Sequence, residues 1–419
     1  MKIAIIGAGS SYTPELFEKL AEKKEELPIK LISLMDIDEV RLEAMASFCR
    51  RYAEHLGLKV KIESTLNMDK AIYGADFVNV QIRVGGNESR KHDEKIPLEE
   101  GFIGQETTGA GGFMKALRTI PEILKIAASI EKNAPEAWLI NYTNPTGIIS
   151  QAIHDYTKIK CAALCAGGLR NTWNTASALG VDARDVQYDI FGLNHLNFTY
   201  NIKVRGKNNS KEEFNKVLDK TGLSPEMKEM TITIEAIPSA YLQYYYHRVK
   251  KIEVHKKEAK SRAEVVLDLE KEIFEDLKNP AFVEKPDSLK KRGGDGYAEV
   301  AALTMEAIHN NRDTWGVVNV PNGNTYSFLP YNAVVETAVM INAHGIKALA
   351  TEPPPKAVWG LVSMVKNYEM LTAEAAVTGD RDTALMALTH HPLVMDYNAA
   401  KILLARLMEA HKDYLPQFK

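Results

Sequence analysis

The chain has 419 residues, of which 45% are hydrophobic and 26% are charged, and it carries a formal net charge of −3. This length exceeds what one hydrophobic core usually organises, so two domains are expected. The small net charge gives no field that would favour nucleic acid or an anionic membrane, and no apolar run approaches the roughly 20 residues of a membrane span. Three cysteines are too few for a disulfide framework, which favours a reducing compartment, so we expect a cytoplasmic protein. From the charge and the short apolar runs we expect neither nucleic-acid nor membrane partners.

The first 40 residues are typical of a βαβ unit that binds a dinucleotide. An apolar strand at 2–6 runs into a glycine turn, a helix pattern follows, and a second apolar strand at 31–35 ends at Asp36. Such a turn brings the backbone close to a pyrophosphate, and an acid about 20 residues later binds a ribose hydroxyl. Tyr12 occupies the third glycine position, so the helix cannot pack as closely on the strand. The candidate cofactor contacts are Gly7, Gly9, Ser10, Ser11 and Asp36. The alternative is an ordinary strand-to-helix turn.

Strand and helix patterns alternate through the rest of the first half. Strands are expected at 59–62, 76–82, 138–141 and 161–165, and helices at 38–56, 118–132 and 173–179. This alternation predicts a parallel sheet with right-handed crossovers, whose ligands bind at the carboxyl ends of the strands. The polar residues just after each strand are therefore candidates for a site.

The pattern changes near residue 186. Strands are expected at 186–191, 198–204, 315–320 and 334–341, helices at 256–277, 298–310, 356–378 and 398–414, and a linker at 278–291. We therefore predict an α/β protein with a Rossmann-type, doubly wound parallel sheet in residues 1–185. Residues 186–419 are predicted to form an α+β domain of antiparallel strands and long helices, which serves catalysis, substrate binding and oligomerisation.

Three peptides that follow predicted strands are rich in polar residues and glycine. Residues 83–90 carry two arginines whose guanidinium groups suit a phosphate or carboxylate, and Arg83 is a candidate cofactor contact. Residues 104–112 form a glycine-rich loop that lets the backbone approach a ligand. Residues 141–145 offer two amides that can bind sugar hydroxyls. Each peptide alone is better explained as a structured loop, but their recurrence at one sheet edge favours a site.

Cys165 and His195 are candidates for a metal site. A thiolate and an imidazole can bind a divalent transition metal, with substrate oxygens completing the coordination. Their spacing is not diagnostic, and a free cysteine is often simply buried. Tyr241 is the first of four tyrosines at 241–246, at a helical spacing that also fits aromatic packing. With an ordinary pKa near 10, a tyrosine acts as a base only where a neighbouring cation lowers that pKa.

Together these motifs resemble those of glycoside hydrolase family 4, the NAD- and metal-dependent glycosidases. The resemblance extends over nearly the whole chain, and the peptide at 409–418 is similar to the 6-phospho-β-glucosidase branch. The other peptides that carry the resemblance lie at 7–15, 93–98, 104–107, 141–145, 192–195, 261–264 and 291–294.

The resemblance implies a redox-assisted elimination in place of the usual two-carboxylate hydrolysis. NAD would take hydride from C3 of the sugar, Tyr241 would remove the acidified C2 proton, and Glu106 would assist Tyr241. A divalent cation, expected to be Mn²⁺, would be held by Cys165 and His195 and would bind the C2 and C3 oxygens. The aglycone would then leave, water would add to C1, and the hydride would return. By the same resemblance a phosphorylated glycoside contacts Arg90, Asn144 and Arg262, in a homodimer or homotetramer.

The chain departs from the family pattern directly after Cys165. Family members usually have Asp there when they cleave phospho-α-glucosides, and Asn-Val-Pro when they cleave phospho-β-glucosides; here Ala166-Gly167-Gly168 follows. Because position 166 offers no general acid for an α-linked leaving group, the resemblance favours hydrolysis of 6-phospho-β-glucosides. A 6-phospho-α-glucosidase, or a family member with altered sugar specificity, is the alternative, and Arg170 is a candidate for an additional anion contact.

Two functions outside the family also fit the glycine turn. An NAD-dependent hydroxyacid dehydrogenase would share the turn and Asp36 but offers no reason for the pairing of Cys165 with His195. A non-catalytic NAD(H) sensor or regulatory subunit would bind the cofactor without turnover. Accumulation of NADH would distinguish the dehydrogenase from a glycosidase, which returns its hydride.

Overall fold

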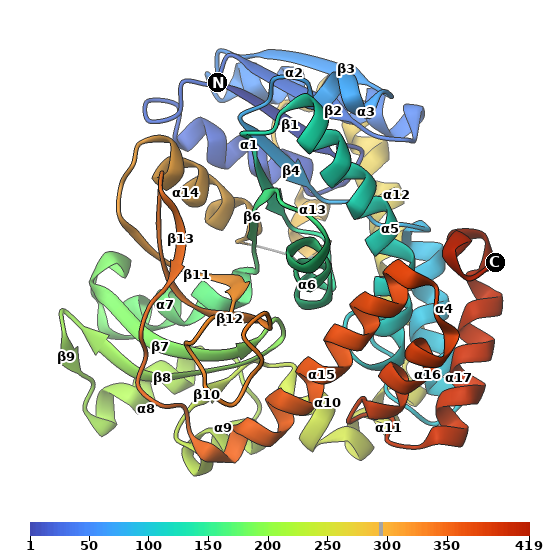
Figure 1. Ribbon diagram of the computed structural model, residues 1–419. Coiled ribbons are helices and arrows are strands. Elements are labelled where there is room, and N and C mark those ends of the chain that lie inside the picture. The colour runs from blue at the N-terminus through green and yellow to red at the C-terminus, as the bar shows by residue number, and fades with distance from the viewer. Residues whose placement is uncertain (293–295) are drawn as a thin grey trace.

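The computed structural model describes residues 1–292 and 296–419, and one large β-sheet lies at its centre (Figure 1). Among the described residues, nine strands hydrogen-bond in the order β13-β12-β11-β6-β5-β4-β1-β2-β3. The six strands from the N-terminal half run parallel, as the alternating pattern predicted. They are β1 (Lys2–Ile6), β2 (Leu31–Met35), β3 (Lys61–Thr65), β4 (Phe77–Val80), β5 (Trp138–Asn141) and β6 (Lys160–Ala163).

Helices cover both faces of this sheet because its central strands are apolar on both faces. Alternate residues of β1 enter opposite cores: Ile3 and Ile5 face one, and Ala4 and Ile6 face the other. The helices of this half are α1 (Thr13–Glu22), α2 (Glu39–His55), α3 (Met68–Ile72), α4 (Gly86–Glu99), α5 (Gly109–Asn133), α6 (Thr146–Tyr156) and α7 (Ala166–Leu179).

Three antiparallel strands from the second half extend the same sheet beyond β6. They are β11 (Thr314–Pro321), β12 (Val334–Asn342) and β13 (Gly345–Ala348). β11 pairs antiparallel with β12 along its length and reaches β6 where Asn319 lies opposite Ala163. Strands were expected near β11 and β12, but no sequence pattern indicated that they join the parallel sheet. The two halves of the chain thus share one sheet, and a domain boundary at 185/186 stays a prediction.

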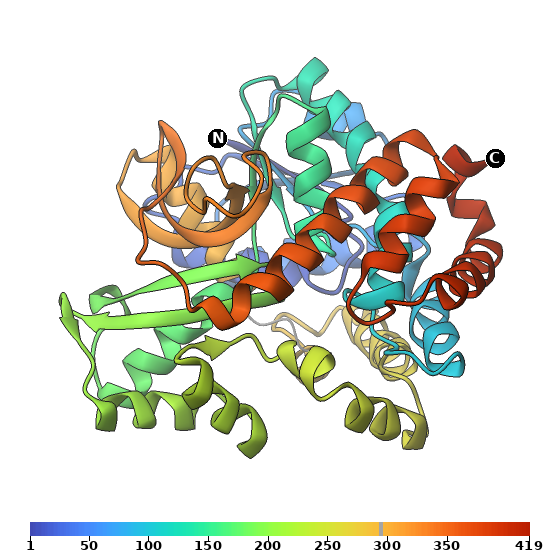
Figure 2. The same cartoon turned by 60° about the horizontal axis from the view of Figure 1, so that its bottom comes forward.

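A second, smaller sheet lies beside the large one and is drawn in green in Figures 1 and 2. In the described chain it contains β7 (Val186–Leu193), β8 (Leu196–Val204), β9 (Lys207–Asn208) and β10 (Ile237–Pro238). β7 and β8 are the predicted antiparallel pair, and a two-residue turn joins them. His195 in that turn has a φ of 67°, a left-handed conformation that is uncommon for a residue with a side chain.

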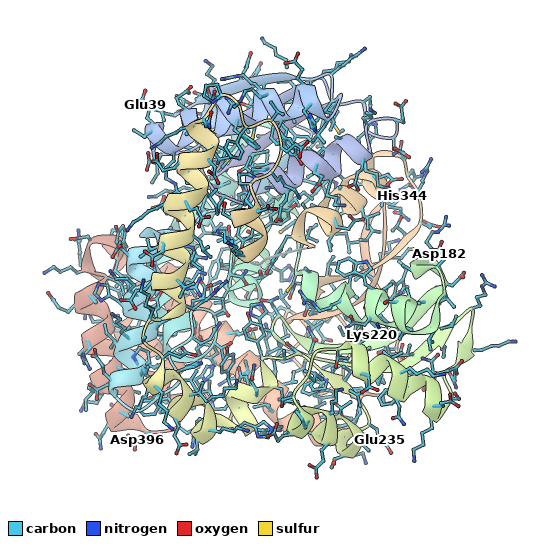
Figure 3. All side chains as sticks on the ribbon, turned by 180° about the vertical axis from the view of Figure 1, so that it is seen from behind. Glu39, Asp182, Lys220, Glu235, His344 and Asp396 are labelled. Atoms are coloured by element: carbon cyan, nitrogen blue, oxygen red, sulfur yellow. The ribbon has the colours of Figure 1, made fainter. Side chains whose placement is uncertain are left out.

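The helices of the second half lie outside these sheets. They are α8 (Lys211–Lys220), α9 (Pro225–Ile234), α10 (Leu242–Tyr246), α11 (Arg248–Lys257), α12 (Arg262–Lys278), α13 (Asp287–Arg292), α14 (Tyr297–His309), α15 (Lys356–Thr378), α16 (Arg381–His390) and α17 (Tyr397–Ala410). α15 runs from the second sheet to the C-terminal helices (Figure 2), and α12 packs against α2 and α4 (Figure 3). No helix in the described ranges is both long and apolar enough to cross a membrane.

Several predicted boundaries are wrong because helices begin earlier or break where a cap intervenes. The loops expected at 83–90 and 104–112 are partly helical, since α4 and α5 begin within them. The helix expected at 256–277 is two helices, because Ser261 and Glu264 form a capping box that starts α12 anew. The helix expected near 173 begins at Ala166, and the linker at 278–291 contains most of α13.

Candidate active site

A cleft of about 1100 Å³ opens beyond the carboxyl ends of β1, β2 and β4 and extends to the turn between β7 and β8. Its walls bring together residues from both halves of the chain. The predicted site residues that line it are Gly7, Gly9, Ser10, Asp36, Arg83, Arg90, Glu106, Asn144, His195, Tyr241 and Arg262. Ser11 and Cys165 do not line it.

The glycine turn has the geometry that a dinucleotide requires. Gly7 has a φ of 84°, and a side chain there would come within 2.9 Å of the Gln81 carbonyl oxygen. The Gly9 N–H donates to Asp36 Oδ2 at 2.7 Å, so a side chain on Gly9 would collide with that carboxylate. The Asp38 N–H donates to Asp36 Oδ1 at 3.1 Å and fixes the other oxygen. The turn and the oriented acid therefore fit a ribose and pyrophosphate.

Ser11 lies behind this turn rather than in the cleft. Its side chain is fully buried, and its hydroxyl lies 3.4 Å from Glu270 Oε1, to which it donates. The side chain of Ser11 therefore does not line the cleft, and its contact with a cofactor stays a prediction. Glu270 does line the cleft, accepts from Asn87 at 3.1 Å and pairs with Arg41 at 3.5 Å. Glu270 therefore ties α12 to the dinucleotide turn, a role that the sequence did not reveal.

Glu106 lies at the centre of a buried cluster of cations. It pairs with Arg83, with Arg90 at 3.0 Å and with Lys115 at 2.7 Å. Burial opposes ionisation of Glu106, but Arg83, Lys115 and Arg90 outweigh it and hold the carboxyl pKa well below its ordinary value. Burial, reinforced by Arg83, lowers the pKa of Lys115 to about 7. Glu106 is therefore an ionised carboxylate that positions Arg83, Arg90 and Lys115 at the cleft wall.

We expect Glu106→Gln to lower the free energy of unfolding by about 3 kcal/mol, because it leaves buried cations without their counter-charge. Chemical denaturation at pH 7 measures this. The cations depress the pKa of Glu106 in the folded protein. The carboxylate therefore stabilises the fold fully above its unfolded-state pKa of about 4.3, and this stabilisation is lost as the pH falls through its folded-state pKa. The difference in the free energy of unfolding between wild type and Glu106→Gln should therefore become smaller in acid.

Glu88→Gln is the matched control for that experiment. Glu88 pairs with Lys91 at 2.6 Å, but its side chain is 69% exposed, so its charge is solvated. Its replacement should change stability by no more than about 0.5 kcal/mol. Equal losses in the two variants would contradict the assignment of Glu106 as the buried counter-charge.

His195 and Tyr241 stack on each other in the cleft. Their ring centroids are 3.9 Å apart and the rings are nearly parallel, at 7°. The two residues meet because β10 pairs with β8, and the Ser239 N–H that follows β10 donates to the Asn197 carbonyl at 2.8 Å. Tyr241, at the start of α10, is thereby brought back to the turn that carries His195.

His195 is prepared to act as a neutral ligand. Burial lowers its pKa to about 4, so the imidazole is uncharged near neutral pH. Its Nδ1 lies 3.0 Å from the Thr107 hydroxyl, which fixes the ring and leaves Nε2 for another partner. Three contacts to Gln105 Oε1, from the backbone N–H groups of Thr107 and Thr108 and from the Thr107 hydroxyl, hold the Thr107 turn.

Cys165 is the N-cap of α7, two residues after the end of β6. The Gly167 N–H donates to its sulfur at 3.4 Å, and the Tyr297 hydroxyl lies 4.0 Å away. Burial, reinforced by Glu336, raises the pKa of the Cys165 thiol to about 12. A thiolate there therefore needs a cation, although the N-terminus of α7 favours the anion.

The residues around Cys165 and His195 fit a metal bound by few protein ligands. Within residues 1–292 and 296–419, no group of three or more His, Cys, Asp or Glu side chains could hold an ion alone. The sulfur of Cys165 and the Nε2 of His195 are donor atoms that a divalent transition metal accepts, and substrate oxygens would complete its coordination. Burial and Glu106 raise the pKa of Tyr241 above its ordinary value, so Tyr241 could act as a base only beside added positive charge.

The candidate substrate residues differ in how freely they can bind a ligand. Asn144 donates to the Tyr297 hydroxyl at 3.3 Å, and Arg262 donates to the Arg292 carbonyl at 2.8 Å. Arg90 lies between Glu94, at 2.6 Å, and Glu106, so part of its guanidinium is already occupied. Arg170 is exposed and does not line the cleft, so the structure does not support an additional anion contact there.

Arg292 is a cleft residue in the peptide at 291–294, to which the sequence analysis assigned no role of its own. Its guanidinium lies 3.8 Å from the centre of the Tyr12 ring and 3.3 Å from Glu270. Its Nε is buried without a partner, so it can donate to a ligand. Gly293 and Gly294 of the same motif lie outside the described residues.

Lys115 and Tyr297 are two further cleft residues that sequence reasoning missed. A signal existed for Lys115, which is the one charged residue in the apolar stretch 109–117. Tyr297 carries no comparable signal, because only the fold brings α14 to Asn144 and Cys165.

Two family models match the chain. The model of the family 4 glycosyl hydrolases matches residues 2–179, and the model of the family 4 glycosyl hydrolase C-terminal domain matches residues 190–394. Together they include every predicted site residue.

Curated relatives and solved structures match over nearly the full length. The "Probable 6-phospho-beta-glucosidase" of Bacillus subtilis (strain 168) is 39% identical over 100% of this chain and 98% of its own. The phospho-alpha-glucosidase PagL of Clostridium acetobutylicum is 30% identical, over 98% of each chain. The structure of the 6-phospho-beta glucosidase from Thermotoga maritima with manganese, NAD⁺ and glucose-6-phosphate is 32% identical over 99% of each chain, with a TM-score of 0.92.

Proposed function

The chain belongs to the family 4 glycosyl hydrolases, and from that premise we propose that it hydrolyses 6-phospho-β-glucosides with NAD and a divalent cation. One observation carries the proposal: a dinucleotide turn and a stacked pair of His195 and Tyr241 share one cleft. The solved relative with manganese, NAD⁺ and glucose-6-phosphate supports the same ligand set.

In this proposal Gly7, Gly9, Ser10 and Asp36 hold the dinucleotide, and Cys165 and His195 hold the cation, for which Mn²⁺ is the first candidate. When bound, NAD supplies a hydride acceptor, and the cation supplies a Lewis acid and the positive charge that lowers the pKa of a neighbouring tyrosine. Thr107 keeps the His195 ring in place, and Arg83 contacts the cofactor from the end of β4.

Tyr241 is the proposed base that takes the proton from C2 of the sugar. Its side chain is partly buried and its ring is fixed against His195, so the base is oriented before substrate arrives. Glu106 acts beside it by holding Arg83 and Lys115 in position. Because Glu106 is ionised at neutral pH, it cannot be the proton donor.

The substrate's phosphate is proposed to bind at the arginines of α4 and α12. Arg262 and Arg90 line the cleft, as does Asn144, which we assign to a sugar hydroxyl. Two guanidinium groups at the cleft wall favour a dianionic phosphate over a neutral sugar.

Preference for the β-linkage rests on the position after Cys165. Ala166 is buried and has no acidic group that could protonate an α-linked leaving group. Its side chain would come within 3.0 Å of a Cβ on Gly296, so little space surrounds it. The Bacillus subtilis relative supports the β reading, while the Clostridium acetobutylicum relative keeps α-hydrolysis as the second candidate.

The test uses protein stripped of NAD and metal, and a chromogenic panel of α- and β-glucosides with and without 6-phosphate. We expect release of the aglycone from the 6-phospho-β-glucoside only after NAD, Mn²⁺ and a thiol are restored. Release by the stripped protein would overturn the proposal. Stoichiometric NADH would favour a hydroxyacid dehydrogenase, and tight NAD binding without turnover on the whole panel would favour a sensor.

We also propose that the protein works in the cytoplasm as a homodimer or homotetramer. Exposed apolar side chains on α15, α16 and α17 support an interface between copies: Met364, Met386 and Ile402 are 40%, 39% and 50% exposed. Three free cysteines suit a reducing compartment.

A further inference from the structure

The C-terminal segment forms part of the cleft wall. Two short 3₁₀ turns, Lys412–Tyr414 and Pro416–Phe418, follow α17. Asp413, Tyr414 and Pro416 line the cleft although they lie more than 300 residues beyond the glycine turn. No role in the proposed reaction uses them.

This segment is anchored rather than frayed. His411 is buried, and its Nε2 lies 3.1 Å from Asp93 Oδ1, a carboxylate that Arg118 also binds. Gln417 donates to the Leu117 carbonyl of α5 at 2.9 Å, and Arg381 donates to the Phe418 carbonyl at 2.8 Å. The residues between these anchors are therefore held in place, and three of them line the cleft.

Tyr414 lies at the nucleotide end of the cleft. A Cβ built on Gly85 would lie 3.1 Å from the Tyr414 ring, so the ring covers the backbone that follows β4. β4 is the neighbour of β1 in the sheet, and in a dinucleotide fold the ends of β1, β2 and the strand beside β1 surround the adenosine half. Apolar side chains from these strand ends, including Ile37 and Ile82, line the same cleft.

The exposure of these side chains points to a ligand. Tyr414 is 42% exposed and Ile37 is 91% exposed, and both line the cleft. An aromatic ring and the aliphatic side chain that follows the ribose-binding acid, in one cleft, suit the flat, weakly polar face of a purine.

We propose that Tyr414 binds the adenosine half of the dinucleotide, with its ring packed against the purine or its ribose. The inference rests on the proposed function only in taking the cofactor to be a dinucleotide. It makes the C-terminal segment part of the cofactor site.

The experiment measures Kd for NAD, ADP-ribose and nicotinamide mononucleotide by calorimetry on the full chain, with the mononucleotide measured by competition. Because base–aromatic stacking is worth roughly tenfold in affinity, Tyr414→Ala should raise Kd about tenfold for NAD and ADP-ribose. Kd for the mononucleotide should not change. Tyr414→Phe, which keeps the ring, should bind all three as wild type does.

Two comparisons keep the result unambiguous. Tyr397→Ala removes a 52% exposed tyrosine of α17 that lies outside the cleft, and it should leave every Kd unchanged. Tyr414→Leu keeps an apolar side chain against Gly85 but removes the aromatic face. It is used in place of Tyr414→Ala if Tyr414→Ala has a lower Tm than wild type. An unchanged Kd for ADP-ribose in a folded variant, or an equal loss for the mononucleotide, overturns the inference. Wild type that binds NAD yet hydrolyses no phosphoglucoside overturns only the proposed function.

Discussion

Tyr241→Phe should lower kcat on a chromogenic 6-phospho-β-glucoside by about a thousandfold, which is within the range that a positioned general base contributes. The Kd for NAD should stay close to that of wild type. Phenylalanine keeps the ring that stacks on His195 and removes only the hydroxyl, so the loss reports proton transfer and not packing. Initial rates and calorimetry on the same preparations measure the two quantities.

Tyr246→Phe is the control for this variant, because Tyr246 is 48% exposed and lies outside the cleft. Its kcat should equal that of wild type. A substrate deuterated at C2 adds a direct readout, since wild type should exchange the label for solvent protons. Undiminished turnover by Tyr241→Phe would remove Tyr241 from the role of base. Full retention of deuterium by wild type would exclude C2 deprotonation from the mechanism.

Cys165→Ser should abolish the stoichiometric metal content of the protein. Loss of a hydrogen bond that merely supports a metal ligand costs up to about a hundredfold in affinity, so loss of the thiolate itself should cost at least that much. Serine is a good N-cap, so α7 should still begin at Ala166 and the fold should persist. Metal analysis after dialysis, with the Tm as a check on folding, measures the effect.

Cys161→Ser provides the matched comparison. Cys161 lies on β6 four residues before Cys165, and burial likewise raises the pKa of its thiol to about 12. Its replacement should leave the metal content and the metal dependence of activity unchanged. A normal metal content in Cys165→Ser would refute Cys165 as a ligand, and a loss in both variants would point to a general effect on this part of the sheet.

The dinucleotide turn shows how much of the site could be predicted. Gly7, Gly9 and Asp36 lie within 30 residues of one another, and their chemistry follows from a strand, a tight turn and a helix that are neighbours in the chain. Ser11 belongs to the same motif, yet its side chain is buried against Glu270 of α12. The sequence of the turn could not predict this, because the packing of α12 decides which side of the turn is buried.

The arrangement of the catalytic end of the cleft could be predicted from the sequence only in part. Cys165, His195 and Tyr241 were candidates because of their residue types, but nothing local places Tyr241 on the His195 ring. That contact depends on the pairing of β10 with β8. The convergence of Arg83, Arg90 and Lys115 on Glu106 depends likewise on how α4 and α5 pack together.

The sequence by itself determined the parallel strands, their order of alternation with helices, and the glycine turn with its acid, because periodic burial and backbone geometry act between residues close in the chain. Only the tertiary structure decided that β11–β13 extend the parallel sheet, that Glu270 and Arg292 reach the dinucleotide turn, and that Tyr414 borders the cleft. These contacts join residues far apart in the chain, and their formation depends on strand pairing and helix packing that no short stretch of sequence encodes.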